Sequence, residues 1–348
     1  MDSRSLTLSA IDGVPERIPF NPFIMHLAAS LVDIDYSRVY CQDAEELANA
    51  QIECAKLFGI DHVNVSTDAF REASAWGVEI DFSGHTPVPK KGTNLNWREF
   101  ELIENPNLLE VPRIQNRIEA VRLLRKKAPN QCVIGWIEAP FAELCSIFDM
   151  IEVIKIWMQK DWERIFKNLL ERIRLIQLEF AKLQIEAGAD IIGAGDSAIS
   201  QIGPKRYKLT TLTATQKLFR EIKKVVPVLY HVCGDNSRVD RDGNDMLKLI
   251  MSSGASIVDI DYQVDLLSAK QKIGKEICIR GNTDTRILGN PIYSSEKVIQ
   301  VVTETVEAGK PNGMYMFAAG CEWPWEPLEI ATRNLSAAKD ITTKHGKY

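Results

Sequence analysis

Short apolar runs alternate with amphipathic stretches along nearly the whole chain. The apolar runs have the length of β-strands, and the stretches between them repeat their hydrophobic positions at helical spacing. Eight strands are expected, at Arg17 to Met25, His62 to Thr67, Cys132 to Glu138, Asp190 to Ala194, Val226 to Val232, Ser256 to Asp261, Ile277 to Gly281 and Met314 to Ala319. The clearest helices are at Asp43 to Phe58, Ile114 to Lys127, Asp161 to Ala187, Thr213 to Lys224, Gly243 to Ser253 and Ser294 to Ala308.

Eight strands, most of them followed by a helix, predict an α/β fold of the (β/α)8 barrel type. A doubly wound open sheet is the main rival, because alternation alone does not close a barrel, and the count of eight favours closure. Residues 69–130 are too long for a simple crossover after the second strand and include Pro87, Pro89, Pro106 and Pro112. We expect a partly helical lid or insertion there, within a single domain spanning residues 1–348.

Composition and charge favour a cytoplasmic enzyme. The chain has 348 residues, 45% of them hydrophobic, and a net charge of -5, so it lacks the basic surface that nucleic acid requires. Its first residues do not resemble a secretory signal, and no apolar run approaches the roughly 20 residues that span a bilayer. The seven cysteines are scattered and odd in number, which favours reduced thiols over a disulfide framework.

The strongest chemical signal is the segment His231-Val232-Cys233-Gly234, which follows an apolar run and is matched much later by Cys321. One imidazole and two thiolates at the ends of two strands can bind zinc and leave its fourth position open, as in a catalytic site. Each residue alone has a simpler interpretation, Cys321 as a small buried side chain and His231 as a core histidine. The combination favours the metal site.

Other polar and aromatic residues lie at the same ends of the expected strands, where the active site of a barrel forms. Glu138, Asp196 and Glu322 are candidate catalytic residues that could orient the substrate or supply a provisional fourth zinc ligand. The candidate substrate contacts are Trp136, Asn282, Asp284, Trp323 and Trp325. Trp323 and Trp325 could instead only cap the core. Asp259 and Asp261 alternate along one strand, and at least one of them could merely form a salt bridge at the rim.

Several motifs occur in the order found in one known superfamily. They are Gly135-Trp136-Ile137-Glu138-Ala139-Pro140-Phe141, Asp196-Ser197-Ala198-Ile199-Ser200, His231-Val232-Cys233-Gly234, Gly281-Asn282-Thr283-Asp284 and Gly320-Cys321. Together they resemble the uroporphyrinogen decarboxylase superfamily, and most closely its corrinoid-dependent branch, the methylcobamide:coenzyme M methyltransferases. The resemblance implies a barrel whose zinc is held by His231, Cys233 and Cys321. It also implies a separate corrinoid-binding protein that supplies the cobalamin, since the chain has no Asp-x-His-x-x-Gly signature.

The sequence leaves the substrate and the direction of transfer open. Two cysteine ligands favour a thiol acceptor such as coenzyme M, because they leave a bound thiolate nucleophilic. The tryptophans beside Cys321 and at position 136 suit an aryl methyl ether as methyl donor to cob(I)alamin, as in O-demethylation. Tetrahydrofolate is a third possible acceptor. Two further alternatives are a metal-free porphyrinogen decarboxylase, disfavoured because residues 18–23 lack the expected arginines, and a non-catalytic zinc-stabilised binding protein.

Overall fold

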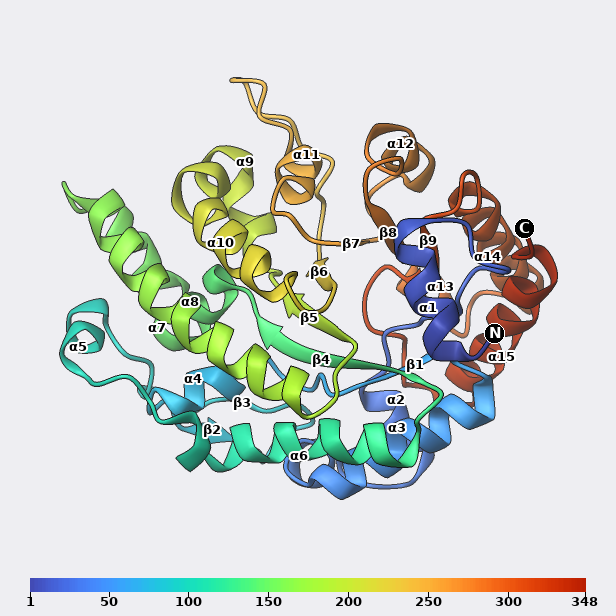
Figure 1. The fold of residues 1–348 in the computed structure, drawn as a ribbon, viewed down its shortest axis with the longest axis horizontal. Helices are drawn as coiled ribbons and strands as arrows, with labels where there is room; N and C mark the ends of the chain where they lie inside the picture. Colours follow the sequence, from blue (N-terminus) through green and yellow to red (C-terminus); the bar gives the residue numbers. More distant parts are fainter.

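The computed structural model describes residues 1–348 and contains a curled parallel sheet with helices packed around it (Figure 1). Seven strands are hydrogen-bonded in the order β1-β4-β5-β6-β7-β8-β9, and every neighbouring pair is parallel. Their bounds are His62–Asn64, Cys132–Glu138, Ile191–Gly195, Val228–Val232, Ile257–Ile260, Cys278–Thr283 and Tyr315–Ala319. All of their residues are buried, because helices cover one face and side chains fill the other. The predicted barrel-like α/β class is confirmed.

Residues 17–25, predicted as the first strand, lie in the gap between β9 and β1 but do not form a regular strand. They exchange two hydrogen bonds with Phe317 of β9, of 2.8 and 3.0 Å, and accept one of 2.9 Å from Asp61 before β1. Pro19 and Pro22 have no amide hydrogen to donate, so a continuous ladder cannot form. The segment bridges the two edges of the sheet through isolated contacts, and the expectation of a regular strand was wrong.

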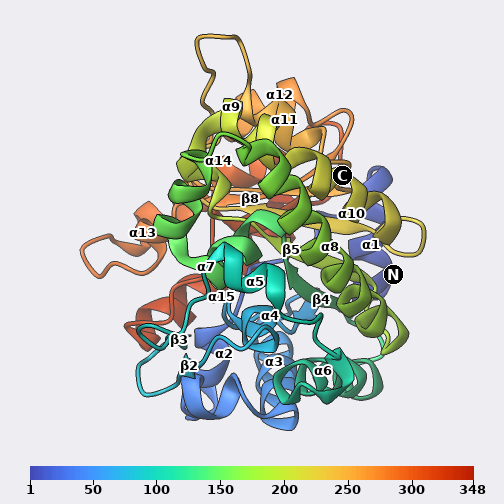
Figure 2. The same ribbon diagram turned by 90° about the vertical axis from the view of Figure 1, so that its left-hand side faces the viewer.

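The helices surround the sheet on its outer side, and Figure 2 shows several of them in front of β4 and β5. In chain order they are α1 (Ser3–Asp12), α2 (His26–Leu31), α3 (Ala44–Phe58), α4 (Arg71–Ala75), α5 (Trp97–Leu102), α6 (Pro112–Lys127), α7 (Pro140–Trp157), α8 (Trp162–Glu186), α9 (Ile199–Thr210), α10 (Leu212–Ile222), α11 (Met246–Met251), α12 (Leu266–Lys272), α13 (Thr285–Leu288), α14 (Ser295–Gly309) and α15 (Leu328–His345). The six predicted helices are all present, with ends within three residues of the predicted ones. None of the helices has the length and apolar character needed to cross a membrane.

The insertion between β1 and β4 is partly helical, as predicted. It contains α4, α5, the antiparallel hairpin formed by β2 (Ile80–Asp81) and β3 (Val88–Pro89), and the crossover helix α6. Two prolines set helix starts, since Pro112 and Pro140 occupy the first turns of α6 and α7, where a missing amide hydrogen costs nothing. The role of residues 69–130 as a lid stays a prediction.

Strand register places the polar residues of the candidate site side by side on the inner face of the sheet. Parallel register pairs Glu138 with Gly195, Gly195 with His231, His231 with Asp259, and Asp259 with Arg280. Residues paired in this way point to the same face, and neighbouring strands lie about 4.8 Å apart. Register alone therefore brings these side chains into one row near the carboxyl ends of the strands.

Candidate metal centre

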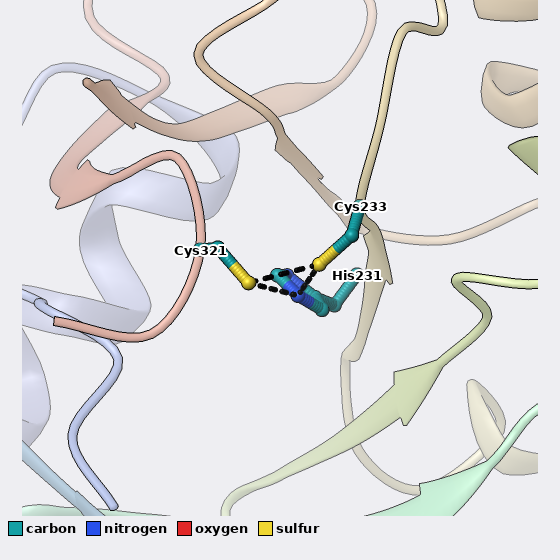
Figure 3. A group of neighbouring side chains, drawn as sticks. All are labelled: His231, Cys233 and Cys321. Atoms are coloured by element: carbon teal, nitrogen blue, oxygen red, sulfur yellow. Dashed lines mark hydrogen bonds between the residues drawn. The ribbon is translucent and has the colours of Figure 1, made fainter. Parts of the chain in front are cut away.

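Three potential ligands converge from two strands that are distant in sequence. His231 lies in β6, and Cys233 is the first residue after that strand. Cys321 lies in the loop after β9 and points toward both (Figure 3). The Nε2 atom of His231 lies 2.8 Å from the Sγ atom of Cys233 and 3.9 Å from that of Cys321, and the two sulfurs are 3.0 Å apart. The structure thus brings the three predicted metal ligands together.

The geometry and chemistry of this cluster fit zinc. All of its ligand atoms lie within 4.8 Å of one another. A zinc ion takes ligands at about 2.0 to 2.3 Å, so small adjustments would place one ion within reach of all three. Both cysteines are partly exposed while the histidine is buried, which leaves one side of the cluster open to a further ligand. The residues present fit a three-ligand catalytic site.

A buried ion pair orients the imidazole of His231. Its Nδ1 atom lies 2.7 Å from Oδ2 of Asp259, and Arg280 donates to the same oxygen at 2.6 Å. Arg280 also donates from Nε to the backbone oxygen of Asn21 at 2.9 Å, and its side chain is almost fully buried. The hydrogen bond from Nδ1 directs Nε2 toward the cysteines, as carboxylate partners of metal-binding histidines do.

The charges in the cluster favour a thiolate. A hydrogen bond from Cys233 and interactions with His231 together outweigh burial and lower the pKa of Cys321 to about 5. Burial opposes protonation of His231, but the Asp259 carboxylate outweighs it and raises the pKa of the imidazole to about 10. The neighbouring Cys321 and burial raise the pKa of Cys233 well above its usual value. At least one sulfur is therefore ready to coordinate a metal without losing a proton first.

Aromatic rings form a wall beside the ligands. Phe23 stacks on Trp136 with ring centroids 4.8 Å apart, and these two rings lie 5.2 and 6.1 Å from the His231 ring. Trp136 crosses over Gly193 of β5, where an added Cβ would lie 2.3 Å from the indole. Trp136 is thus beside the metal site, as expected, and Gly193 makes room for it.

Glu138 occupies the next position along the same wall. An added Cβ at Gly195 would lie 2.8 Å from its Oε2 atom, so the carboxyl group extends over the glycine that separates Glu138 from His231. The Nη2 atom of Arg71 lies 3.5 Å from Oε1, and Glu72 accepts a hydrogen bond from the Glu138 amide at 2.8 Å. Burial, reinforced by Glu72, raises the pKa of Glu138 well above its usual value.

Asp196 lies just beyond β5, behind this layer. The Tyr230 hydroxyl donates a hydrogen bond to Oδ2 of Asp196 at 2.7 Å. The backbone amide of Asp196 donates to the backbone oxygen of His231 at 2.9 Å. Burial raises the pKa of Asp196 to about 7. The side chain is 1% exposed, so Asp196 supports β6 from within the protein.

Glu322, which follows Cys321 in the chain, and Trp325 are both engaged with His26. The Glu322 carboxylate accepts a hydrogen bond from the His26 amide at 2.7 Å and lies 3.0 Å from its Nδ1 atom. Trp325 stacks on the His26 ring at 5.1 Å. Trp325 and His26 line a surface cleft of about 360 Å³ that also includes Tyr36 and Arg38.

Three predicted substrate contacts are not brought to the cluster. Trp323 is fully buried and donates from its indole nitrogen to the backbone of Ala331 in α15 at 3.1 Å. Asn282 donates to the backbone oxygens of residues 261 and 264. Asp284 caps α13 and pairs with Arg286. In this structure all three have structural partners instead.

Sequence reasoning missed several residues of the site. Arg280 and Phe23 bear no motif. Asp259, expected at a strand end with a salt bridge at the rim as one possible role, lies inside the barrel against His231. Glu72 and Glu143 lie on helices and are fully buried. One signal was present in the sequence. Gly193 and Gly195 alternate on one strand, and Trp136 and Glu138 alternate on the preceding strand, which indicates that the two large side chains lie over the two glycines.

Comparison with known proteins places the chain in a family. The family model described as "Uroporphyrinogen decarboxylase (URO-D)" matches residues 4–340. A uroporphyrinogen decarboxylase of Geobacter sp. (strain M21) is 25% identical over 305 residues, covering 82% of this chain and 84% of its own length. The uroporphyrinogen decarboxylase of Synechocystis sp. is 27% identical over 252 residues, covering 64% and 68%.

Solved structures share the fold. A methyltransferase from Methanosarcina mazei superposes with a TM-score of 0.84 at 20% identity and covers 98% of both chains. A B12-independent methionine synthase from Shewanella sp. W3-18-1 has a TM-score of 0.55 at 14% identity and covers 94% of this chain and 97% of its own. These likenesses support the barrel-like architecture.

Proposed function

The chain belongs to the uroporphyrinogen decarboxylase family, and from this premise we propose that it is a zinc-dependent methyltransferase that works with a corrinoid. In this proposal a methyl group moves between the cobalt of a cobalamin carried by a separate corrinoid-binding protein and a small substrate held at the metal centre. The observation that carries the proposal is the convergence of His231, Cys233 and Cys321, with sulfur and nitrogen atoms 2.8 to 3.9 Å apart and one side open. The fold shared with a methyltransferase supports it.

The donor set favours a thiol as the methyl acceptor. Zinc bound here would hold a substrate thiol as its thiolate, which is the nucleophilic form. The two cysteines lower the Lewis acidity of the site, and the Asp259 carboxylate behind His231 adds further negative charge. The protein side of the reaction is therefore to orient the substrate sulfur toward the open face and to keep it deprotonated. The phenyl and indole rings of Phe23 and Trp136 exclude water on one side.

A second candidate is demethylation of an aryl methyl ether, with cob(I)alamin as the methyl acceptor. The stacked pair Phe23 and Trp136 favours it, because a flat apolar substrate would pack well against two rings 4.8 Å apart beside the metal ligands. Tetrahydrofolate as acceptor has no specific observation in its favour.

Decarboxylation of a porphyrinogen is disfavoured by the interior charges. A substrate with several carboxylates needs free cationic side chains, and residues 18–23 provide none. Arg280 reaches the backbone of Asn21 in this region, but its guanidinium is already paired with Asp259 at 2.6 Å. Arg280 is therefore not free to bind a substrate carboxylate.

The test combines metal analysis with spectrophotometry of cobalamin under anaerobic conditions. We expect one zinc per chain and loss of methylcobalamin when a thiol is added. Formation of methylcobalamin from cob(I)alamin and a methoxyarene would instead establish the second candidate. A chain that binds zinc but supports neither reaction would be a zinc-stabilised binding protein, and a zinc-free chain that decarboxylates a porphyrinogen would overturn the proposal.

A further inference from the structure

Two polar groups lie together on the inner wall of the candidate metal site. The indole nitrogen of Trp136 and Oε2 of Glu138 lie 3.5 and 2.8 Å from the same point, the position of an added Cβ on Gly195. Both residues are nearly buried, at 4% and 6% exposure, and both lie in register with the glycines of β5. Gly195 is also the register partner of His231, so the Glu138 carboxyl lies over the one strand position that separates it from His231.

Three glutamates share one arginine behind this wall. Glu72 and Glu143 are fully buried; Glu143 has no hydrogen-bond partner at either carboxyl oxygen, and Oε2 of Glu72 has none. Arg71 is the cation nearest to Glu138, at 3.5 Å, which is the outer limit of a hydrogen bond. One guanidinium cannot balance three buried carboxylates, so protons must be retained in the group.

The other charges that face Glu138 reinforce this conclusion. Asp68 follows β1 and is paired with Arg113 at 2.6 Å, and its negative charge helps to raise the pKa of Glu138. Asp196 approaches from the end of β5, and its negative form also opposes ionisation of Glu138. Burial is the largest cause of the raised pKa of Glu138, followed by Glu72, and Arg71 only partly offsets them.

We propose that Glu138 is held as the neutral carboxylic acid and, together with the indole N–H of Trp136, donates hydrogen bonds to an acceptor oxygen of the substrate. The inference rests on the proposed function and specifies its substrate. A carboxylic acid and an indole both offer donors, so they select an oxygen with free lone pairs and disfavour an ammonium group. The oxygen has two possible sources, an acidic or hydroxyl tail on a thiol acceptor and the ether oxygen of a methoxyarene.

Infrared difference spectroscopy tests the protonation state without any turnover. The zinc-loaded protein at neutral pH should show the carbonyl stretch of a protonated carboxylic acid that disappears in Glu138→Gln. The control is Glu171→Gln, because Glu171 is a partly exposed carboxylate paired with Arg174 at 2.6 Å and should contribute no such band. A protonated-acid band that is unchanged in Glu138→Gln would overturn the inference.

Substrate comparison tests the donor role. Thiols of equal length with a sulfonate, a hydroxyl or an ammonium tail are compared by KM in the methylcobalamin assay, and a methoxyarene is tested with cob(I)alamin. We expect the oxygen-bearing tails to be favoured, a rise in KM of about tenfold in Glu138→Leu, and a smaller rise in Glu138→Gln, whose amide still donates. Preference for the ammonium tail, or equal losses in the two variants, would contradict the inference. If no substrate reacts, the proposed function fails, while the infrared result still decides the state of Glu138.

Discussion

His231 and Asp259 are register partners on neighbouring parallel strands, and Nδ1 of the imidazole lies 2.7 Å from the aspartate Oδ2. Arg280, the next partner in the same row, donates to that oxygen. The carboxylate therefore fixes the imidazole before any metal binds, and the guanidinium balances its charge in the barrel interior. The candidate metal centre is thus built on a row of residues from three strands as well as on its three candidate ligands.

Replacing Asp259 should weaken the metal centre without removing a ligand. We expect Asp259→Asn to lower zinc affinity about 10- to 100-fold, because the imidazole loses the charge of its partner. Competition with a chelator measures the affinity. Asp284→Asn is the control, since Asp284 caps α13 and pairs with Arg286. Equal zinc affinity in Asp259→Asn and the unaltered protein would show that the contact does not support His231.

The two ligand cysteines should differ from the other thiols in metal binding. Cys233→Ala should reduce bound zinc from one ion per chain to a small fraction, because two protein ligands hold the ion poorly. Cys278→Ala should keep it, because Cys278 is fully buried in β8 outside the cluster. Metal analysis after dialysis distinguishes them. Full zinc retention in Cys233→Ala would refute the ligand assignment.

Position 193 requires glycine, because the Trp136 ring occupies the space of a larger side chain. A Cβ there would lie 2.3 Å from the Trp136 ring, so Gly193→Ala should lower the free energy of unfolding by about 1–3 kcal/mol. Gly84→Ala is the matched control, because the nearest atom to its Cβ would be 3.7 Å away in an exposed loop. Denaturant titration measures both. A loss in Gly193→Ala no larger than in the control would mean that Trp136 is free to move aside.

Glu143 should make the fold less stable as pH rises above the pKa of an unfolded glutamate. Burial, followed by Glu72 and Glu138, raises the pKa of Glu143 well above its usual value, so the folded chain binds this proton more tightly than the unfolded chain does. The resulting stability is complete below about pH 4, the range of an unfolded glutamate, and is lost as pH rises toward the folded pKa. Calorimetry between about pH 6 and pH 9 should show a smaller fall in Tm for Glu143→Gln than for the unaltered protein. Parallel curves would contradict this prediction.

The sequence predicted what depends on local patterns and missed what depends on register. Apolar runs located seven strands, and residues at strand ends identified His231, Cys233 and Cys321. Pro19 and Pro22 mark where the remaining predicted strand is irregular, because each removes a donor from the ladder. Arg280 and Asp259 could not be paired from sequence, since that requires knowing which residues lie opposite each other in β7 and β8. Burial of Glu143 on a helix likewise depends on how that helix packs.

The most direct test of the account is the rate of methylcobalamin consumption with a thiol acceptor, measured before zinc removal, after it, and after zinc is restored. We expect turnover in the zinc-loaded protein, loss of nearly all of it on chelation, and recovery when zinc returns. An unchanged rate in zinc-free protein would contradict the role given to His231, Cys233 and Cys321. No turnover in the zinc-loaded protein with thiols or methoxyarenes would contradict the proposed methyl transfer itself.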